Sequence, residues 1–282
     1  MKIGSYIYNG KASYGVKLDD GIFDLGQRLG KFYPDLPTLI KAFALGEAAE
    51  ASRNQSPDFR EEDVYFLSLM PAPVNIYCAG INYLDHIEET GRDKPEFPTL
   101  FMKSQQSMIG HGQELVRPKV SDQFDFEGEF AVVIGKPGRY IAKENWKDYI
   151  AGYTIIMDGS IRDFQKRSVD QGKNFYHSSS SGPWLITMDE VPGDFRDMKL
   201  TTRLNGKVMQ ASDLGKLCFD VSDLISYYSQ IFYFQPGDMI ATGTPGGVGS
   251  RRDPPVWMKP GDELEVEITG IGILKNAVVG EN

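Results

Sequence analysis

The sequence has few cysteines and few histidines. Cys78 and Cys218 are the only cysteines among 282 residues. They lie far apart in apolar surroundings, which favours two buried free thiols over a disulfide or a metal clip. The three histidines, His86, His111 and His177, are too few for a site built on several imidazoles. Any metal that this chain binds would therefore be held by oxygen ligands.

Long apolar runs and basic runs are also missing. No apolar stretch approaches the roughly 18 residues that indicate a membrane-spanning helix, and the beginning, MKIGSYIYNGKASYG, lacks the basic start and apolar segment of a signal peptide. The net charge of −9 and the lack of basic runs longer than a pair argue against nucleic acid as a partner. We therefore expect a cytoplasmic protein that binds neither membranes nor nucleic acids.

The chain does have enough apolar residues for a core, since 41% are hydrophobic and 12% are aromatic. Three strands are predicted at KIGSYIY, ASYGVKL and IFDL, followed by a helix over residues 36–51. Short apolar runs separated by Gly and Pro follow and indicate a mainly β domain with a few helices. We expect a small N-terminal α/β domain at residues 1–68 and a larger domain at residues 69–282, which together make an α+β, mainly β fold.

The stretch DFEGEFAVVIG, residues 125–135, places two acidic residues beside an apolar, β-branched run that predicts a strand. Glu127 and Glu129 are two residues apart, so on a strand both side chains project to the same side with about 6.6 Å of rise between them. If that side is exposed, both carboxylates are simply solvated. If it is buried, one must be protonated or a cation must lie between them.

A third acidic residue, Asp158, follows the apolar run from Tyr153 to Met157, which predicts another strand. It precedes a predicted helix that we expect to be capped near Ser160. Carboxylates from two strand ends would suit Mg²⁺ or Mn²⁺ and leave ligand positions open for water and a chelating substrate. A helix-capping role for Asp158 is an equally good interpretation of this residue alone.

The segment AGINYLDHIEETG predicts a short helix that ends at Gly91. His86 and Glu89 lie three residues apart, hence on one helix face with about 5–6 Å between their Cβ atoms. A carboxylate beside an imidazole raises its basicity and fixes its tautomer, as a general base requires. Taken alone, the pair is more typical of an ordinary surface pair. Lys173, in DQGKNFYHSSSSGPW, lies among turn-forming residues and could equally be a solvated loop lysine.

The joint pattern resembles the fumarylacetoacetate hydrolase family. From Ile76 to Val278 the family's motifs occur in order, namely NYxDHxxE, DxExE, GYTxxxDxSxRDxQ, GKxF followed by GPW, NGxxxQ and PGDxIxTGTPxGVG. The resemblance implies a mixed β-sandwich roll, usually dimeric. It also implies that a divalent metal is held by Glu127, Glu129 and Asp158. Members of this family hydrolyse, decarboxylate, isomerise or dehydrate 2-oxo acids and 1,3-diketones.

The resemblance further implies roles for residues outside the three carboxylates. In hydrolytic members a His–Glu pair on a lid helix activates water, and His86 with Glu89 matches that motif here. Lys173 would be the third catalytic residue and would add positive charge for an anionic substrate. Residues expected to bind the substrate are Arg162, Gln165 and, in the glycine-rich loop at residues 242–250, Thr244. That loop is interpreted as a mobile loop near a ligand, with a plain surface loop nearly as well supported.

The favoured interpretation is a Mg²⁺-dependent hydrolase that cleaves a carbon–carbon bond in an acylpyruvate or a related 2,4-diketo acid, with Mn²⁺ or Ca²⁺ as alternative metals. The alternative is an oxaloacetate-type decarboxylase, an isomerase or a dehydratase that uses the same metal-bound enolate. A third interpretation, a binding protein for Ca²⁺ and a sugar acid, is less favoured because binding alone needs no base. The sequence departs from the family pattern at Met157 and in YHSSSSGPW, so it does not determine the substrate. His177 is expected to be solvated.

We expect the protein to form a homodimer.

Overall fold

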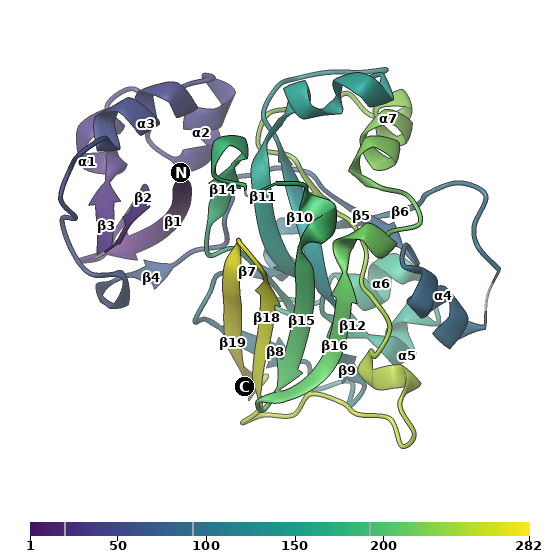
Figure 1. Ribbon diagram of the computed structural model, residues 1–282. Helices are drawn as coiled ribbons and strands as arrows, with labels where there is room; N and C mark the ends of the chain where they lie inside the picture. Colours follow the sequence, from purple (N-terminus) through teal and green to yellow (C-terminus); the bar gives the residue numbers. More distant parts are fainter. Residues whose placement is uncertain (20, 92, 192) are drawn as a thin grey trace.

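The computed structural model describes residues 1–19, 21–91, 93–191 and 193–282. Its centre is a 12-stranded mixed sheet that runs through the middle of the molecule (Figure 1). The order along this sheet is β3 (Gly21–Asp24), β2 (Lys11–Leu18), β1 (Lys2–Tyr8), β14 (Leu185–Thr187), β11 (Ile150–Met157), β10 (Gly128–Ile134), β17 (Met239–Ala241), β5 (Ile76–Gly80) and β6 (Thr99–Lys103). Three short strands attach to this path, namely β4 (Tyr65–Phe66), β7 (Met108–Ile109) and β13 (Ser179–Ser181).

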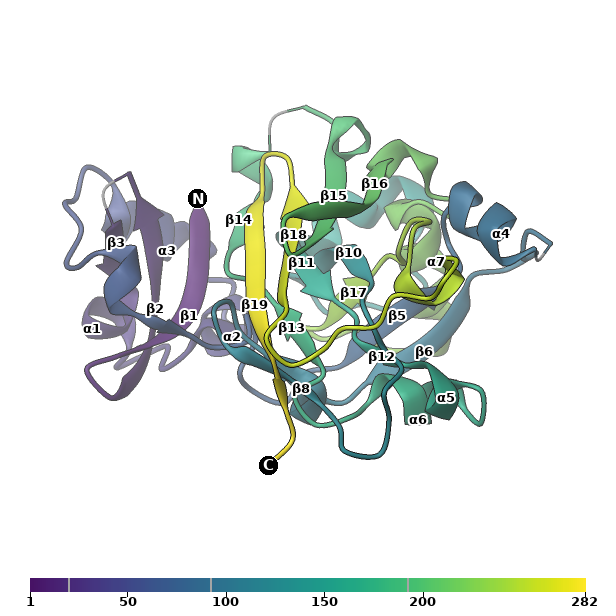
Figure 2. The same ribbon diagram turned by 90° about the horizontal axis from the view of Figure 1, so that it is seen from below.

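A second sheet of five strands packs against the central one, and Figure 2 shows it lying in front of β10 and β11. Its order is β16 (Lys207–Asp213), β15 (Lys199–Leu204), β18 (Glu263–Ile268), β19 (Gly272–Gly280) and β8 (Glu114–Arg117). Strands β9 (Phe124–Asp125) and β12 (Ser160–Ile161) form a separate pair. The expectation of an α+β, mainly β architecture with a sandwich of sheets is confirmed.

Helices are short and lie at the edges of the sheets (Figure 1). They are α1 (Leu25–Leu29), α2 (Leu36–Lys41), α3 (Leu45–Ser52), α4 (Leu84–Thr90), α5 (Arg162–Gln165), α6 (Val169–Lys173) and α7 (Val221–Ile231). Turns of 3₁₀ helix occur at Glu61–Asp63, Gln105–Ser107, Lys143–Tyr149, Met188–Glu190, Phe195–Asp197, Leu214–Lys216 and Gly249–Arg251. Among the described residues, no helix has the length and apolar character needed to cross a membrane.

The N-terminal region joins the central sheet directly, because β1 pairs with β14. Its buried helix residues, such as Leu39 and Ile40, share one apolar cluster with Ala131 and Val133 of β10. The single helix predicted over residues 36–51 is instead two helices, and the chain between them turns at Phe43, whose φ is 58°. The boundary expected between residues 68 and 69 stays a prediction.

The pairing of β10 with β11 positions the acidic residues. Both strands are buried along their whole length, as the apolar runs GEFAVVI and IAGYTIIM require. The two strands run antiparallel with Gly128 opposite Met157, so the start of β10 lies beside the end of β11. The backbone N–H of Asp158 donates to the carbonyl of Glu127 at 2.8 Å. Residues just before β10 and just after β11 are therefore neighbours.

Gly128 is required at this position by the approach of the second sheet. A Cβ atom there would lie 2.2 Å from Oγ1 of Thr202 and 2.9 Å from Cγ1 of Val266. We expect Gly128→Ala to lower the free energy of unfolding by about 1–3 kcal/mol through overpacking, as measured by urea denaturation. Gly46→Ala is the matched control: nothing lies within 4 Å of its Cβ position in α3, so it should be neutral or stabilising. Equal stability of the two variants would contradict this prediction.

Candidate metal centre

Three carboxylates meet at the ends of β10 and β11. Ligand oxygens of Glu127, Glu129 and Asp158 all lie within 4.8 Å of one another. Their side chains are buried, with 6%, 1% and 0% of the residue surface exposed. The sequence alone leaves open whether the two glutamates face solvent or the interior, and the structure places them inside. The combined charge must therefore be compensated locally.

Two buried lysines supply part of the compensation. Nζ of Lys173 lies 2.6 Å from Oε2 of Glu127 and 2.6 Å from Oδ2 of Asp158. It is 2% exposed at the end of α6, so it is not a solvated loop lysine. Nζ of Lys103 lies 2.6 Å from Oδ1 of Asp158 and also donates to the carbonyl of Lys173. Together the lysines bond both oxygens of the Asp158 carboxylate, so this residue is not a simple helix cap.

Arg162 supplies the third positive charge. Its Nη2 lies 2.7 Å from Oε1 of Glu127 and 2.7 Å from Oδ2 of Asp125, while Nε donates to the same Asp125 oxygen at 2.7 Å. Nη1 donates to Oε1 of Gln165 at 2.9 Å. Arg162 begins α5, and Ser160 lies in β12, so the helix cap expected near Ser160 is wrong: the chain pairs with β9 before it turns into the helix.

Lys103 and Asp125 are site residues that sequence reasoning missed. Lys103 is the one buried position of β6, whose other residues are half-buried or exposed. A lysine at the end of an apolar run such as TLFM was the only available signal, and it is weak, because most lysines there are solvated. Asp125 is the first residue of the DxExE motif, but no role was predicted for it, because its partners Arg162, Gly249 and Ser250 come from distant segments.

The electrostatic environment shifts the pKa values of the two glutamates in opposite directions. Burial opposes ionisation of Glu127, but the positive charges of Lys173 and Arg162 lower its pKa to about 2. Burial and the negative charges of Asp158 and Glu127 instead raise the pKa of Glu129 well above its ordinary value. Among the described residues, Glu129 forms no ion pair; its Oε2 accepts a hydrogen bond from the N–H of Gly243 at 2.8 Å. Glu129 is thus the carboxylate that still lacks a cation.

The His–Glu pair of α4 is within electrostatic reach of this cluster. Nδ1 of His86 is 3.0 Å from Oε2 of Glu89, and His86 is only 7% exposed. Burial opposes ionisation of Glu89, but the bond to His86 and the N–H of Gly247 lower its pKa. A carboxylate at this position favours the tautomer in which Nδ1–H donates a hydrogen bond to it. The charge of His86 also lowers the pKa of Glu127, so the imidazole is within electrostatic reach of the three carboxylates. This is not an ordinary surface pair.

The glycine-rich loop at residues 242–250 borders the same site. Oγ1 of Thr244 donates to the carbonyl of Gly128 at 2.9 Å, and Nε2 of Gln210 donates to Thr244 at 2.7 Å and to the carbonyl of Pro245 at 2.8 Å. Oε1 of Gln210 in turn accepts from the N–H of Gly128 at 3.0 Å. Residues 242–245 are buried, so this part is not a plain surface loop.

Other expected features lie farther from the cluster. Cys78 and Cys218 are free as predicted, although Cys218 is only half-buried. His177 is half-buried and stacks on Tyr176 with 3.7 Å between ring centroids.

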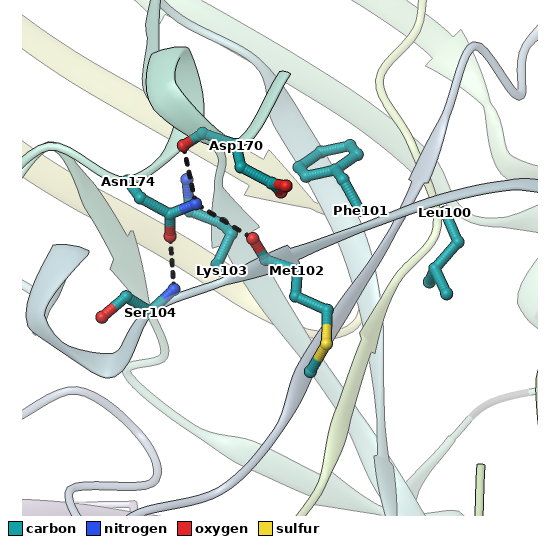
Figure 3. Close-up of a pocket in the computed structure, with 7 residues that line it drawn as sticks. All are labelled: Leu100, Phe101, Met102, Lys103, Ser104, Asp170 and Asn174. Atoms are coloured by element: carbon teal, nitrogen blue, oxygen red, sulfur yellow. Dashed lines mark hydrogen bonds between the residues drawn. The ribbon is translucent and has the colours of Figure 1, made fainter. Parts of the chain in front are cut away.

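A pocket of about 480 Å³ on the outside of β6 (Figure 3) is lined by Leu100, Phe101, Met102, Lys103, Ser104, Asp170 and Asn174. Nζ of Lys173 lies 5.1 Å from the ring centroid of Phe101, so this pocket borders the lysine side of the cluster.

Comparison with known proteins identifies the family. Residues 75–279 match the model of the fumarylacetoacetate (FAA) hydrolase C-terminal domain, so the chain belongs to this family of enzymes, as the motifs suggested. The oxaloacetate tautomerase Fahd2a, mitochondrial, of Rattus norvegicus is 37% identical over 273 residues, which cover 94% of this chain and 87% of the relative.

Proteins of known structure with this fold are named for different reactions. The fumarylacetoacetate hydrolase of Exiguobacterium antarcticum matches with a TM-score of 0.87 and 32% identity, and the maleylpyruvate hydrolase of Sphingobium sp. SYK-6, in complex with manganese (II) ion and pyruvate, with 0.84 and 27%. A 5-carboxymethyl-2-hydroxymuconate delta-isomerase of Mycobacterium smegmatis matches with 0.78 and 27%. Each comparison covers 100% of both chains. Family membership therefore establishes an enzyme without selecting one reaction.

The uncompensated Glu129 predicts how metal and pH affect stability. Because its pKa is raised in the folded protein, its contribution to stability is full below the ordinary value of 4.5 and is lost as the pH rises through the raised value. In EDTA at pH 8 we expect Glu129→Gln to melt a few degrees above the wild type, since about 1 kcal/mol shifts Tm by about 2–4 °C in a chain of this size. With Mg²⁺ or Mn²⁺ the order should reverse, because only the wild type binds the ion tightly.

Calorimetric melting curves from pH 5 to pH 8, with EDTA and with each metal, measure both effects. Glu114→Gln is the matched control, because Glu114 is exposed on β8. It should melt like the wild type under every condition. Wild-type melting that does not respond to EDTA, Mg²⁺ or Mn²⁺ would contradict the assignment of this cluster as a metal site.

Proposed function

We propose that this member of the fumarylacetoacetate hydrolase family binds a divalent cation at Glu127, Glu129 and Asp158 and interconverts the keto and enol forms of a small 2-oxo dicarboxylic acid of the oxaloacetate type. The observation that carries this proposal is the buried His86–Glu89 pair within electrostatic reach of three carboxylates. The rat relative, which matches most of this chain, is named an oxaloacetate tautomerase. This supports the alternative group of reactions over the hydrolysis that the sequence motifs favour.

The residues present fit a divalent metal. A carboxylate offers about four lone-pair sites, and the lysines and Arg162 use only part of those on Glu127 and Asp158. Glu129 has a free Oε1 and no ion pair among the described residues. A bound Mg²⁺ or Mn²⁺ would chelate the substrate and withdraw electron density from its 2-oxo group, which favours loss of the neighbouring proton.

The charge of the site suits an anionic substrate. When every carboxylate carries its charge, as ligation of a metal requires, Asp125 and the three metal-site residues together with the three cations Lys103, Lys173 and Arg162 sum to −1. A dication raises this sum to +1. Lys173 uses two of its three N–H donors on carboxylates, so one remains for a substrate oxygen. Nη2 of Arg162 lies 2.7 Å from oxygens of both Glu127 and Asp125, so Arg162 would favour an anionic substrate through its charge.

His86 is the proposed base. Because Nδ1–H donates to Glu89, Nε2 carries the free lone pair. In tautomerisation, Nε2 takes a proton from the carbon beside the 2-oxo group, the C–H electron pair forms the enol double bond, and the π pair of the C=O bond moves onto the oxo oxygen. The imidazolium then returns the proton to that oxygen. Glu89 keeps the imidazole in this tautomer and stabilises the imidazolium that forms between the two transfers. Gln165 positions Arg162, and we propose that Thr244 binds substrate from the glycine-rich loop.

Hydrolysis of an acylpyruvate or related 2,4-diketo acid is the second candidate. The same Nε2 can take a proton from water instead of carbon, and the resulting hydroxide attacks the distal carbonyl to break the carbon–carbon bond. The maleylpyruvate hydrolase of Sphingobium sp. supports this candidate through its shared fold. Decarboxylation of oxaloacetate would use the same cluster but no attacking water.

The tautomerase proposal predicts a large loss of catalytic rate when the His86 side chain is removed. We expect His86→Ala to lower the rate of oxaloacetate enol–keto conversion by about 10²–10⁴-fold, the usual contribution of a general base. Metal affinity should stay near that of the wild type, because His86 bonds Glu89 and not the carboxylate cluster. The measurement is the decay of enol absorbance, with Mn²⁺ affinity determined by calorimetry.

His177→Asn is the control, since this half-buried residue stacks on Tyr176 and its φ of 50° suits Asn. It should convert oxaloacetate at the wild-type rate. Parallel assays for release of pyruvate from acylpyruvates separate the second candidate from the first. Unchanged enol–keto conversion in His86→Ala would show that this pair is not the base, and the proton-transfer mechanism through Nε2 would have to be abandoned.

We also propose that the protein acts in the cytoplasm as a homodimer. The rat relative is named mitochondrial, so the cytoplasmic location is proposed from the sequence and not from this relative. The β6 edge of the central sheet, with half-buried Leu100, Phe101 and Met102, supports association, because an open apolar edge favours pairing with another chain. Light scattering at micromolar concentration should give about twice the chain mass of 31.5 kDa. A mass near 31.5 kDa at every concentration would rule out the dimer.

A further inference from the structure

Asp125 is a fully buried carboxylate that contacts two separate parts of the protein. Its Oδ1 accepts hydrogen bonds from the backbone N–H groups of Gly249 at 2.7 Å and Phe126 at 2.9 Å. Its Oδ2 accepts from the N–H of Ser250 at 2.9 Å and from Nε of Arg162 at 2.7 Å. A carboxylate has about four lone-pair sites, and these donors fill them. Asp125 therefore has no site left for a metal or a substrate.

The bond between Asp125 and Arg162 connects Asp125 to the metal cluster. The same Arg162 side chain that Asp125 holds through Nε places Nη2 2.7 Å from Oε1 of Glu127. Gln165 fixes the other arm of the guanidinium through Nη1. Because the guanidinium is planar and rigid, holding Nε and Nη1 sets the position of Nη2. Asp125 thus contributes through Arg162 to the position of one oxygen of Glu127, while Lys173 bonds the other.

The bonds of Asp125 to Gly249 and Ser250 connect it, through the loop at residues 246–250, to the lid helix α4. Two residues before Gly249, the N–H of Gly247 donates to Oε1 of Glu89 at 2.9 Å, and the N–H of Gly246 donates to Oδ1 of Asp85 at 3.2 Å. Oγ of Ser212 also donates to Asp85, at 3.2 Å. The loop therefore bonds two acidic residues one helical turn apart on α4. Figure 1 shows β9, α5 and α4 on one side of the molecule.

The loop has little freedom between these two attachments. A Cβ atom at Gly249 would lie 2.0 Å from the carbonyl oxygen of Val256 and 2.6 Å from Oδ1 of Asp125. At Gly247, with a φ of +98°, a Cβ atom would lie 2.2 Å from the carbonyl oxygen of Met209. Backbone packed this closely on both sides transmits a displacement at one end to the other.

We propose that Asp125 is a positioning residue that couples the metal site to the lid helix. One side of it orients Glu127 through Arg162, and the other orients Glu89 and His86 through the loop at residues 246–250. This inference rests on the metal site of the proposed function. Its consequence is thermodynamic: an ion that fixes Glu127 also stabilises the placement of the base, and a placed lid tightens ion binding by the same factor.

The test compares Asp125→Asn, Asp85→Asn and the wild type. An Asn amide at position 125 keeps one acceptor oxygen, presents N–H donors in place of the other, and removes the negative charge that faces Arg162. It therefore weakens the contacts of Asp125 at nearly constant volume. We expect Mn²⁺ affinity, measured by calorimetry on the folded protein, to fall by about 10–100-fold, as for loss of a residue that orients a metal ligand. Asp85→Asn weakens only the attachment of the lid, so its Mn²⁺ affinity should change much less.

Hydrogen exchange measures the coupling itself. In the wild type, Mn²⁺ should slow amide exchange in peptides covering α4 and residues 244–250. In Asp125→Asn saturated with Mn²⁺, this slowing in α4 should disappear. Asp122→Asn is the matched control, because the Asp122 side chain is 88% exposed and pairs only with Arg117 in the described structure. It should behave like the wild type in both measurements.

The outcomes separate the inference from the proposed function. If the wild type does not bind Mn²⁺, the metal site fails and the inference is overturned with it. If the wild type binds Mn²⁺ and Asp125→Asn binds it equally well, or keeps the slowing in α4, only the inference is overturned. A purely structural role would lower Tm and leave both measurements unchanged. Should Asp125→Asn not fold, Arg162→Lys replaces it, since lysine cannot bridge Asp125 and Glu127, and the same losses are expected.

Discussion

The arrangement of this molecule depends on the compensation of buried negative charge at the ends of β10 and β11. Removing a carboxylate from water costs several kcal/mol unless opposite charge and hydrogen bonds replace the solvent. Here Glu127 and Asp158 obtain that replacement from Lys103, Lys173 and Arg162. These cations come from β6, α6 and α5, so the charge cluster ties three peripheral elements to the centre of the sheet.

The fold supplies rigidity where the site needs it. Antiparallel pairing of two fully buried strands fixes the spacing between Glu127, Glu129 and Asp158. On the opposite face of β10, Gly128 admits close contact with the second sheet, and Gln210 from that sheet bonds both Gly128 and Thr244. The three carboxylates therefore lie on β10 and at the adjoining ends of β10 and β11, whereas the proposed base lies on the short helix α4, which bonds both the loop at residues 246–250 and Ser212 of β16. The candidate metal ligands and the proposed base are thus held by separate elements of the fold.

Much of this could be predicted from the sequence, because local patterns determine it. The spacing of Glu127 and Glu129 on an apolar strand set their common face, and Gly91 ends α4 in the left-handed conformation, with a φ of 65°, as predicted. Burial could not be predicted, and it decides whether the His86–Glu89 pair and Lys173 belong to a site. The role of Lys103 could not be predicted, because its partner, Asp158, is 55 residues away in the sequence. The break at Phe43 similarly reflects packing of α2 and α3 on the sheet, which overrides a continuous helical pattern.

The reaction is the feature that neither the sequence nor the fold determines alone, and the geometry explains why. Tautomerisation, hydrolysis and decarboxylation all pass through negative charge on a 2-oxo acid, and the cluster stabilises that charge whatever happens next. What differs is the atom that meets Nε2 of His86: a carbon-bound proton, a water molecule or neither. Under the proposed function, that choice depends on where α4 holds His86, and the loop at residues 246–250 contributes to this placement through its bonds to Asp85 and Glu89. Proteins similar to this chain are named for tautomerisation, hydrolysis and isomerisation. These reactions need the same stabilisation of negative charge, so under the proposed function they would diverge at the base on α4 and not at the carboxylates.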